Sequence, residues 1–232
     1  MARTRAPDRL QHVLDAAIAV FIQAGYRQGR IEDVARAAGV APATVLLYAR
    51  SKEALFELAL RHALHDHSVL DEPLPYSAPP ATDLIERVWQ RLKAVARFPT
   101  LDAAPKKAPA MGGRAELEAI IREGYRWQLH YHRALLLVER CARDWPELAA
   151  LFYQEFRRGV LNRITSHLKR RAEQGALREL PDQAVAARIV VEIIAFFAMH
   201  RHRAPDSEMD DERAEAAVVD FISHALHPTK LR

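Results

Sequence analysis

The apolar residues of this 232-residue chain recur at helical spacing almost everywhere, and this periodicity constrains the fold more than any other feature. In the first amphipathic stretch they stand three and four positions apart, as Leu10, Val13, Leu14, Ala17, Ile18 and Phe21. No strand-like alternation persists, and no internal repeat is found in the sequence. We therefore expect an all-α protein of about nine helices, four short ones followed by five mostly longer ones.

Glycines, prolines and polar caps set the expected helix boundaries. Gly25 ends the first helix, and Ser51 caps the fourth. A proline-rich segment, residues 71–82, is expected as an ordered elbow or loop, and residues 98–113 as a second loop. The helix at residues 114–143 could bend at Gly124. The second to ninth helices are expected at residues 31–38, 42–48, 52–65, 83–97, 114–143, 146–174, 182–202 and 212–226.

Composition and charge narrow the class of protein. Half of the chain is hydrophobic, which is enough for a core, but no apolar run reaches the ~18 residues of a membrane span. The basic N-terminus lacks the apolar region of a signal peptide, and the lone Cys141 suits a reducing compartment, so we expect a cytoplasmic protein that avoids membranes. Residues 1–50 hold seven arginines against four acids, a net charge of +3, which fits a polyanionic partner or a solvated face.

Three small or apolar residues have the spacing of a helix-turn-helix motif. Ala35 is small enough for a steep crossing of two short helices, and Gly39 can adopt the left-handed backbone of the turn between them. Val45, six residues after Gly39, can bury its side chain against the preceding helix. An ordinary helical hairpin remains the alternative on spacing alone.

Longer segments around this motif resemble the tetracycline-repressor (TetR/AcrR) family of regulators. These segments read VLDAAIAVFIQAGY, IEDVARAAGV and SKEALFELAL, and the resemblance covers about residues 7–67. It implies a DNA-binding helix-turn-helix domain at residues 7–67 and a C-terminal regulatory and dimerisation domain at residues 68–232. The function it implies is a ligand-responsive transcriptional regulator, most often a repressor, that binds a double-stranded DNA operator as a homodimer.

The same resemblance assigns the DNA contacts. Thr44 and Tyr48 occupy positions where family members touch DNA, and Lys52 occupies that of a phosphate contact. The chain departs from the family at Gly29–Arg30, where the usual cap is missing, and at Leu46 and Ala49, where aromatic residues are usual. These departures leave the strength and sequence preference of DNA binding open. The full set of expected DNA-binding residues is Arg30, Ala41, Ala43, Thr44, Leu47, Tyr48 and Lys52.

Aromatic residues in the later helices suggest walls for an effector pocket, although most could equally belong to the core. The resulting expectation is a small apolar or aromatic effector with Glu192 or His130 as a polar anchor. Glu192 could instead pair with Arg188 at a dimer interface. The expected ligand-binding residues are Trp89, Tyr125, Trp127, Tyr131, Phe152, Phe156 and Glu192. The expected dimer face consists of Val185, Ile189, Val190, Ile193, Ile194 and Phe197 with Val218, Val219 and Ile222.

Other constellations favour plainer interpretations. The spacing of His62, His65 and Asp66 is compatible with a metal ion, but histidines near a helix C-terminus also suit the helix dipole. Cys141 is expected as a packed thiol. No catalytic set or cofactor motif occurs, so we expect neither an enzyme nor a bound metal or cofactor. A helical small-molecule-binding protein with weak or lost operator recognition is the alternative function, and the sequence gives neither the effector, the operator nor the sign of regulation.

Overall fold

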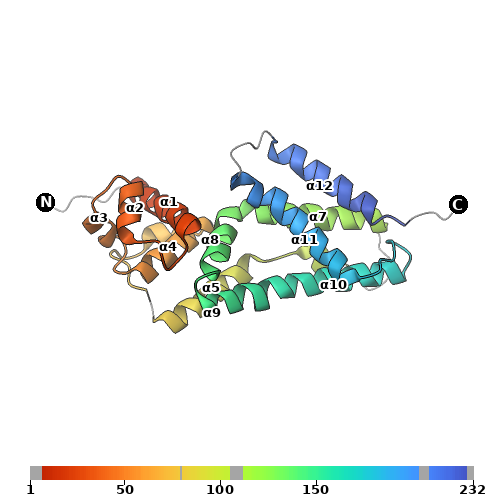
Figure 1. The fold of residues 1–232 in the computed structure, drawn as a ribbon, viewed down its shortest axis with the longest axis horizontal. Coiled ribbons are helices and arrows are strands. Elements are labelled where there is room, and N and C mark those ends of the chain that lie inside the picture. The colour runs from red at the N-terminus through yellow and green to blue at the C-terminus, as the bar shows by residue number, and fades with distance from the viewer. Residues whose placement is uncertain (1–6, 79, 105–111, 204–208, 229–232) are drawn as a thin grey trace. The chain divides into compact units, whose positions relative to one another are not determined.

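The computed structural model describes residues 7–78, 80–104, 112–203 and 209–228, and these residues form an all-α fold without a β-strand (Figure 1). They divide into two compact units. Unit 1 comprises residues 1–95 and 133–155, and unit 2 comprises residues 96–132 and 156–232. The division at residues 67 and 68, expected from the sequence, is one of function and stays a prediction.

Unit 1 contains the predicted helix-turn-helix. Gly39 has the left-handed backbone that the turn requires, with φ of +61°, and Ser51 Oγ accepts a hydrogen bond from the Ala54 amide at 3.2 Å. Ala35 and Val45 are buried, as the crossing of the two short helices requires. The helices are α1 (Pro7–Ala24), α2 (Ile31–Ala37), α3 (Pro42–Leu46), α4 (Lys52–Ala63), the short 3-10 helix η1 (His67–Asp71), α5 (Ala81–Val95), α8 (His132–Ala142) and α9 (Pro146–Ala149).

Aromatic side chains join the short helices of unit 1 to its later segment. The rings of Phe21 on α1 and Phe56 on α4 meet edge to face at 5.9 Å between centroids. Tyr26 packs against Phe56 at 5.5 Å and stacks on Trp145 at 4.3 Å. Aromatic contacts of this kind add to the free energy of area burial. The helix-turn-helix therefore rests on a core that includes Trp145, more than a hundred positions after the Gly39 turn.

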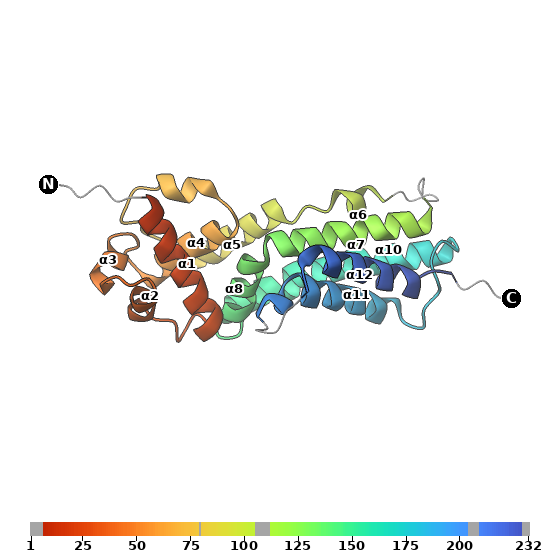
Figure 2. The same ribbon diagram turned by 90° about the horizontal axis from the view of Figure 1, so that it is seen from above.

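Unit 2 is built on four helices. Figures 1 and 2 show α7 (Gly113–His130), α11 (Gln183–Ala198) and α12 (Asp211–Ala225) side by side, and α10 (Arg158–Glu173) packs against α11. Asp182 and Asp210 cap α11 and α12 through backbone amides. The unit also contains α6 (Pro99–Ala103) and the 3-10 helix η3 (His200–Arg203). Its buried core includes Leu117, Ile121, Tyr125, Leu168, Val190 and Ile194.

Two long helices expected from the sequence are interrupted. Residues 114–143 form α7 and α8, which are separated at Tyr131 and not at Gly124. His132 Nδ1 lies 2.7 Å from the Leu129 carbonyl oxygen and competes for a helix-end acceptor, an interruption that side-chain periodicity cannot reveal. Residues 146–174 contain a π-helical stretch, η2 (Ala150–Arg157), between α9 and α10. Helix α6 occupies part of the loop expected at residues 98–113, of which residues 105–111 lie outside the described residues.

The expected dimer face is partly wrong. Val190, Ile194, Val218, Val219 and Ile222 are buried within unit 2, because α11 is packed against α7, α10 and α12 at once. The large apolar side chains that α11 and α12 leave exposed are Val185, Ile189, Phe196 and Phe221. By length and composition alone, the stretch Gln183–Arg203 is long and apolar enough to cross a membrane. Part of this stretch is buried in the core of unit 2, which is typical of a core helix.

Candidate DNA interface and regulatory site

A small apolar surface protrudes where the DNA-reading helix was expected. Ala41 and Ala43 are exposed and Thr44 is half-buried, as a groove-facing surface requires. Leu47 is 49% exposed, and its neighbour Leu46, which the residue-by-residue assignment left out, is 44% exposed. Exposed leucines of this size carry a free-energy cost in water unless a partner covers them. The arrangement suits contact with thymine methyl groups in a major groove.

The predicted groove contact of Tyr48 is not supported, because its side chain is only 2% exposed. Helix α3 ends at Leu46, two residues earlier than the sequence indicates, and the following turn directs Tyr48 and Ala49 into the core. The groove contact of Tyr48 came from the family resemblance alone, whereas the helical spacing of the motif is compatible with an inward position.

Lys52 is engaged within the protein. Its Nζ donates a hydrogen bond to the Arg27 carbonyl oxygen at 3.0 Å and lies 4.7 Å from the centre of the Tyr26 ring. Partial burial lowers the pKa of the Lys52 ammonium. The lysine therefore fixes the turn between α1 and α2, and its predicted phosphate contact stays a prediction.

Two exposed basic side chains lie near α3 in the sequence. Arg30 is exposed at the start of α2, where no side chain caps the helix, as the departure at Gly29–Arg30 indicated. Arg50 is also exposed, directly after the turn that follows α3. The sequence assignment missed Arg50, although its position between Tyr48 and Lys52 was the available signal.

Tyr76 supports the turn after α3 from a distant segment. Its amide donates to the Tyr48 carbonyl oxygen at 2.8 Å, and its carbonyl accepts from the Arg50 amide at 2.9 Å. These two bonds form an isolated parallel bridge between Ala49 and Tyr76. The proline-rich segment expected as an elbow is therefore attached to the backbone that carries Leu46 and Leu47. In the sequence, the only indication of this attachment was Tyr76, the single aromatic residue of the proline-rich segment.

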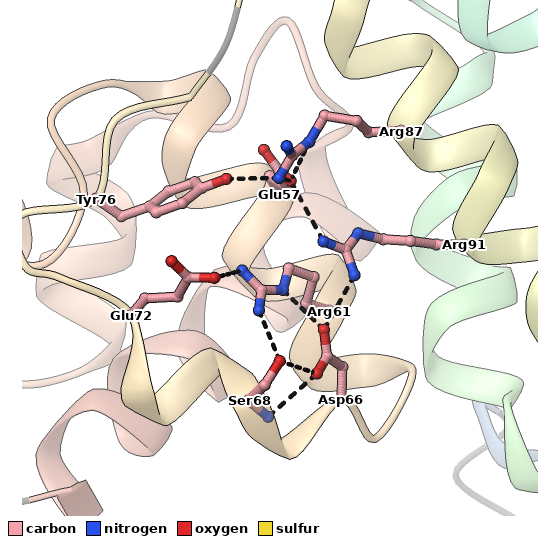
Figure 3. A network of polar contacts seen from close by, with 8 residues as sticks. All are labelled: Glu57, Arg61, Asp66, Ser68, Glu72, Tyr76, Arg87 and Arg91. Atoms are coloured by element: carbon pink, nitrogen blue, oxygen red, sulfur yellow. Dashed lines mark hydrogen bonds and ion pairs between the residues drawn. The ribbon is translucent and has the colours of Figure 1, made fainter.

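The Tyr76 side chain leads into a network of buried charges (Figure 3). Glu57 on α4 is almost completely buried and accepts from Arg87 Nε on α5 at 2.8 Å. Arg87 also donates to the Tyr76 hydroxyl at 3.0 Å, and Arg91 NH2 lies 3.8 Å from the same Glu57 oxygen. Glu57 Oε2 accepts no hydrogen bond from the described residues. Glu57 thus holds both α5 and the proline-rich segment.

Arg61, one turn further along α4, forms the second half of the network (Figure 3). Its guanidinium donates to Asp66 at 2.8 Å and to Ser68 Oγ at 3.0 Å, and pairs with Glu72. Arg91 joins the halves, because it also contacts Asp66 at 3.0 Å. Burial opposes ionisation of Asp66, but hydrogen bonds from Ser68 and Arg61 outweigh it and lower the pKa of this carboxyl. The network, three carboxylates and three guanidiniums, ties α4 to η1, residues 72–76 and α5.

The seven residues expected to bind an effector are distributed over both units, Trp89 and Phe152 in unit 1 and the other five in unit 2. Trp127 lies with Phe98 at 5.1 Å, Tyr131 at 5.6 Å and Phe156 at 5.9 Å between ring centroids, a half-buried aromatic cluster in unit 2. Tyr125 belongs to the core, and its hydroxyl donates to the Phe197 carbonyl oxygen at 3.3 Å. The structure thus brings together three of the expected residues, Trp127, Tyr131 and Phe156.

The remaining expected ligand residues have other contacts. Trp89 and Phe152 lie in unit 1, where Lys93 covers the Trp89 ring at 5.0 Å and Phe152 is buried beside Tyr153. Glu192 pairs with Arg188, the alternative that the sequence left open, and also with Arg157.

A second buried glutamate, Glu116 on α7, lies in unit 2. Arg171 on α10 is fully buried and grips it with two bonds, from Nε at 2.6 Å and NH2 at 2.7 Å. His167, one turn before Arg171, is 2% exposed, and neither ring nitrogen has a hydrogen-bond partner among the described residues. Burial lowers the pKa of His167 to about 4, so the imidazole is neutral at pH 7. Its Nε2, 3.8 Å from Glu116, therefore forms no ion pair at that pH.

His167 also lines a pocket of about 340 Å³. The aromatic residues expected as pocket walls do not contribute to it, and the sequence analysis did not single out its residues. They are hard to find from the sequence because α10 resembles an ordinary solvated basic helix. The lining residues are Leu101, Asp102, Ala104, Asn162, Arg163, Ser166, His167 and Arg170.

The histidine-rich end of α4 and the lone cysteine have structural contacts. His62 Nε2 lies 3.2 Å from Asp15 Oδ1, and Asp66 belongs to the network around Arg61. Within the ranges that the structure describes, no three metal-ligating side chains gather as a metal site. Burial raises the pKa of the Cys141 thiol to about 12, so it is protonated and unreactive at neutral pH.

Known proteins resemble both the motif and the fold. Residues 13–59, which contain the helix-turn-helix, match the family described as bacterial regulatory proteins, tetR family. This part of the chain is similar to the DNA-binding domain of the tetR family. No curated protein sequence matches the chain at a significant level. Its similarity to solved structures is one of fold, and the matched helix-turn-helix domain supports a transcriptional regulator.

Three solved structures illustrate that similarity. The ketosteroid transcriptional regulator KstR2 of Mycobacterium tuberculosis has a TM-score of 0.59 and 14% identity, over 96% of each chain. A tetR-family regulatory protein from Rhodococcus RHA1 has a TM-score of 0.57 and 16% identity, over 98% of this chain and 100% of that one. The regulator PfmR from Thermus thermophilus has a TM-score of 0.50 and 20% identity, over 91% and 97%. At these identities the likeness concerns the fold alone.

Proposed function

We propose that this regulator represses transcription in the cytoplasm by binding a double-stranded DNA operator as a homodimer, and that a small effector releases it. Residues 7–67 would bind DNA, and residues 68–232 would bind the effector and the second subunit. The observation that carries the proposal is the exposed face of α3, with Leu46 and Leu47 protruding directly after the Gly39 turn. No catalytic step is assigned to the chain.

DNA binding on this proposal combines apolar base contacts with charge. The alanines and leucines of residues 41–47 would pack on thymine methyls, while Arg30, Arg50 and Lys52 would contact phosphates. Tyr48 would act from the core by fixing the end of α3. The missing polar contact at residue 46 makes the expected preference one for A·T-rich half-sites.

A homodimer is supported by the apolar side chains that unit 2 leaves exposed. Val185, Ile189 and Phe196 on α11 and Phe221 on α12 are each more than half exposed, and these helices are in contact with each other. Two such pairs of helices can form a four-helix interface about a twofold axis. A single recognition helix of five residues contacts few bases, and a dimer supplies the second half-site.

Effector response would be a shift between two states of the dimer with different operator affinity. We propose an apolar or aromatic effector, because Trp127, Tyr131 and Phe156 are half-buried and form an aromatic cluster with buried Phe98. The proposed route to DNA runs through α5, since Arg87 bonds both Glu57 on α4 and the Tyr76 hydroxyl. Tyr76 in turn bonds the backbone on either side of Ala49.

The test is protection of DNA upstream of the regulator's own gene, followed by titration at several salt concentrations. We expect two protected half-sites and an affinity that falls steeply with salt. Lys52→Ala should weaken binding to all sequences alike and lower the salt slope by about one. Absence of any specific protection, with small-molecule binding retained, would favour the alternative of a helical small-molecule-binding protein without operator recognition.

A second measurement tests the dimer. Replacing exposed Ile189 with Glu should give monomers by sedimentation and abolish specific DNA binding, whereas the same replacement at exposed Ala37, on α2, should leave the dimer intact. A dimer that survives Ile189→Glu would place the interface elsewhere.

A further inference from the structure

We propose that the pocket between α6 and α10 binds the carboxylate of a small monocarboxylic acid, with Arg170 and His167 as its anchors. This inference rests on the proposed effector response and gives that effector a chemical class. The remainder of the acid, aliphatic or aromatic, would lie along the apolar part of the pocket.

The pocket has two walls with different chemistry. Helix α10 supplies five lining side chains, Asn162, Arg163, Ser166, His167 and Arg170, whose spacing places them on one helix face. The opposite wall is Leu101, Asp102 and Ala104, at the end of α6. A volume of about 340 Å³ lies at the small end of the range for organic ligands.

Unused hydrogen-bonding capacity indicates what the pocket accepts. Both ring nitrogens of His167 and the Nε of Arg170 are buried without a hydrogen-bond partner among the described residues. Buried polar groups in folded proteins are nearly always paired, so a ligand that supplies partners to some of these atoms would be stabilised there. Two of them must donate, the Arg170 N–H and the one N–H of neutral His167. A carboxylate accepts from both through its two oxygens and donates nothing.

The charges of the lining residues select a singly charged anion. Arg163 is compensated by its ion pair with Asp102, and His167 is neutral at pH 7. Arg170 forms no ion pair with the described residues, so the described lining carries one uncompensated positive charge. Glu116, the nearest carboxylate to His167, is neutralised by Arg171 and would repel an incoming anion little. A phosphate dianion would need a second positive charge.

The pocket also adjoins apolar and aromatic side chains. Leu101 and Ala104 line it, and the Arg163 guanidinium lies 5.2 Å from the centre of the Phe98 ring. Phe98 in turn contacts Trp127 in the aromatic cluster. An acid whose carboxylate meets Arg170 would therefore have its apolar part next to Leu101, which favours short aliphatic and aromatic acids over dicarboxylates.

The experiment is isothermal titration of the full chain with benzoate and hexanoate, and with benzamide and inorganic phosphate as comparisons. We expect saturable binding of one acid per chain and none of the amide or of phosphate. Arg170→Gln should weaken acid binding about tenfold or more, because a charge-assisted hydrogen bond is lost. Lys169→Gln, the exposed neighbour on α10, is the matched control and should bind as the unaltered protein does.

His167 provides a second variant with a readout beyond stability. His167→Gln retains a donor and an acceptor and should keep much of the affinity, whereas His167→Leu should lose it while remaining folded. Benzoate should also shift the imidazole nitrogen resonances of His167 in the unaltered protein. Acid binding that Arg170→Gln leaves unchanged, binding of phosphate alone, or no binding of either acid would each overturn the proposal.

Operator binding measured on the same samples separates this inference from the proposed function. If the acids bind through Arg170 but no operator is protected, the pocket assignment stands and the proposed regulatory function fails. If the operator is protected but neither acid binds, the pocket assignment alone fails.

Discussion

The two buried glutamates of this protein, Glu57 in unit 1 and Glu116 in unit 2, are neutralised in different ways. Glu57 pairs with Arg87 and Arg91, which are partly exposed, and its network extends over four segments of chain. Glu116 pairs with one fully buried arginine, Arg171, through two parallel bonds. The first arrangement distributes charge across elements that must stay aligned, and the second confines it to one contact between two helices.

This difference determines which groups near each glutamate are left without a hydrogen-bond partner. The network around Glu57 uses Arg87 to hold Tyr76 of the proline-rich segment, and the Tyr76 backbone bonds the turn after α3, which carries the proposed DNA-contacting surface. The compact Glu116–Arg171 pair leaves the neighbouring His167 without a hydrogen bond, beside a pocket. A buried ion pair is weak evidence for stability in itself, but breaking one partner is costly. Single substitutions can therefore distinguish the two arrangements.

The largest effect is expected from Arg171→Met. It leaves Glu116 buried and unpaired, which should lower the free energy of unfolding by about 3–5 kcal/mol. Urea unfolding monitored by circular dichroism measures this loss. The double variant Glu116→Leu with Arg171→Met should recover much of the stability, since neither charge remains. A loss below about 1 kcal/mol for the single variant would show that Glu116 is not enclosed as the structure has it.

The next effect is a pH dependence from His167. Burial lowers its pKa from the unfolded value of 6.5 to about 4 in the folded chain, so the unfolded state binds the proton more readily. Stability should therefore fall as pH decreases from about 6.5 to about 4, by up to ~3 kcal/mol from this group. The charged groups that face His167 are Glu116, Arg170 and Arg171. His167→Leu should flatten this part of the stability profile, and an unchanged profile would contradict the burial of a neutral imidazole.

A smaller effect is expected at Glu57. Glu57→Gln removes the charge that Arg87 and Arg91 share, but both arginines can turn towards solvent, so we expect a loss of about 1–3 kcal/mol. The matched control is Asp33→Asn, which breaks the exposed pair with Arg36 and should cost less than about 1 kcal/mol. Thermal unfolding of the two variants side by side measures the difference. Equal losses of stability in the two variants would show that Glu57 contributes no more than an ordinary exposed ion pair.

The smallest effect on stability, and the most specific one, concerns the Tyr76 hydroxyl. Tyr76→Phe removes the hydroxyl that accepts a hydrogen bond from Arg87, at a cost of about 0.5–1.5 kcal/mol. The Arg50 amide donates a hydrogen bond to the Tyr76 carbonyl oxygen, and hydrogen exchange of this amide should become faster. Unchanged exchange at Arg50 would indicate that the network and the turn after α3 are not coupled.

The sequence predicted the elements that depend on local chemistry. Gly39 and Ser51 have the predicted backbone and cap, and the all-α fold follows from the helical periodicity. Tyr48 and Lys52 show the limit of this approach. The inward position of Tyr48 accompanies the bridge to Tyr76, 28 residues away, and Lys52 is held by a carbonyl in another turn. Such partners cannot be identified from spacing along one helix.

The proposed effector site was harder to predict for a related reason. Aromatic residues at helical spacing occur in cores and pockets alike, and here Trp89 and Tyr125 lie in different units. The pocket is instead defined by what its residues lack, namely partners for His167 and Arg170. An unmet hydrogen bond is a property of the folded chain, and no residue pattern records it.

Operator affinity of three variants tests the central claim, that the protruding face of α3 contacts DNA while Tyr48 supports it from the core. Fluorescence anisotropy with the protected upstream duplex would compare Leu46→Ser, Leu47→Ser and Tyr48→Phe. We predict a loss of about tenfold or more for each leucine variant, from lost base contacts, and at most a few-fold loss for Tyr48→Phe. A large loss for Tyr48→Phe with no effect of either leucine variant would contradict the account.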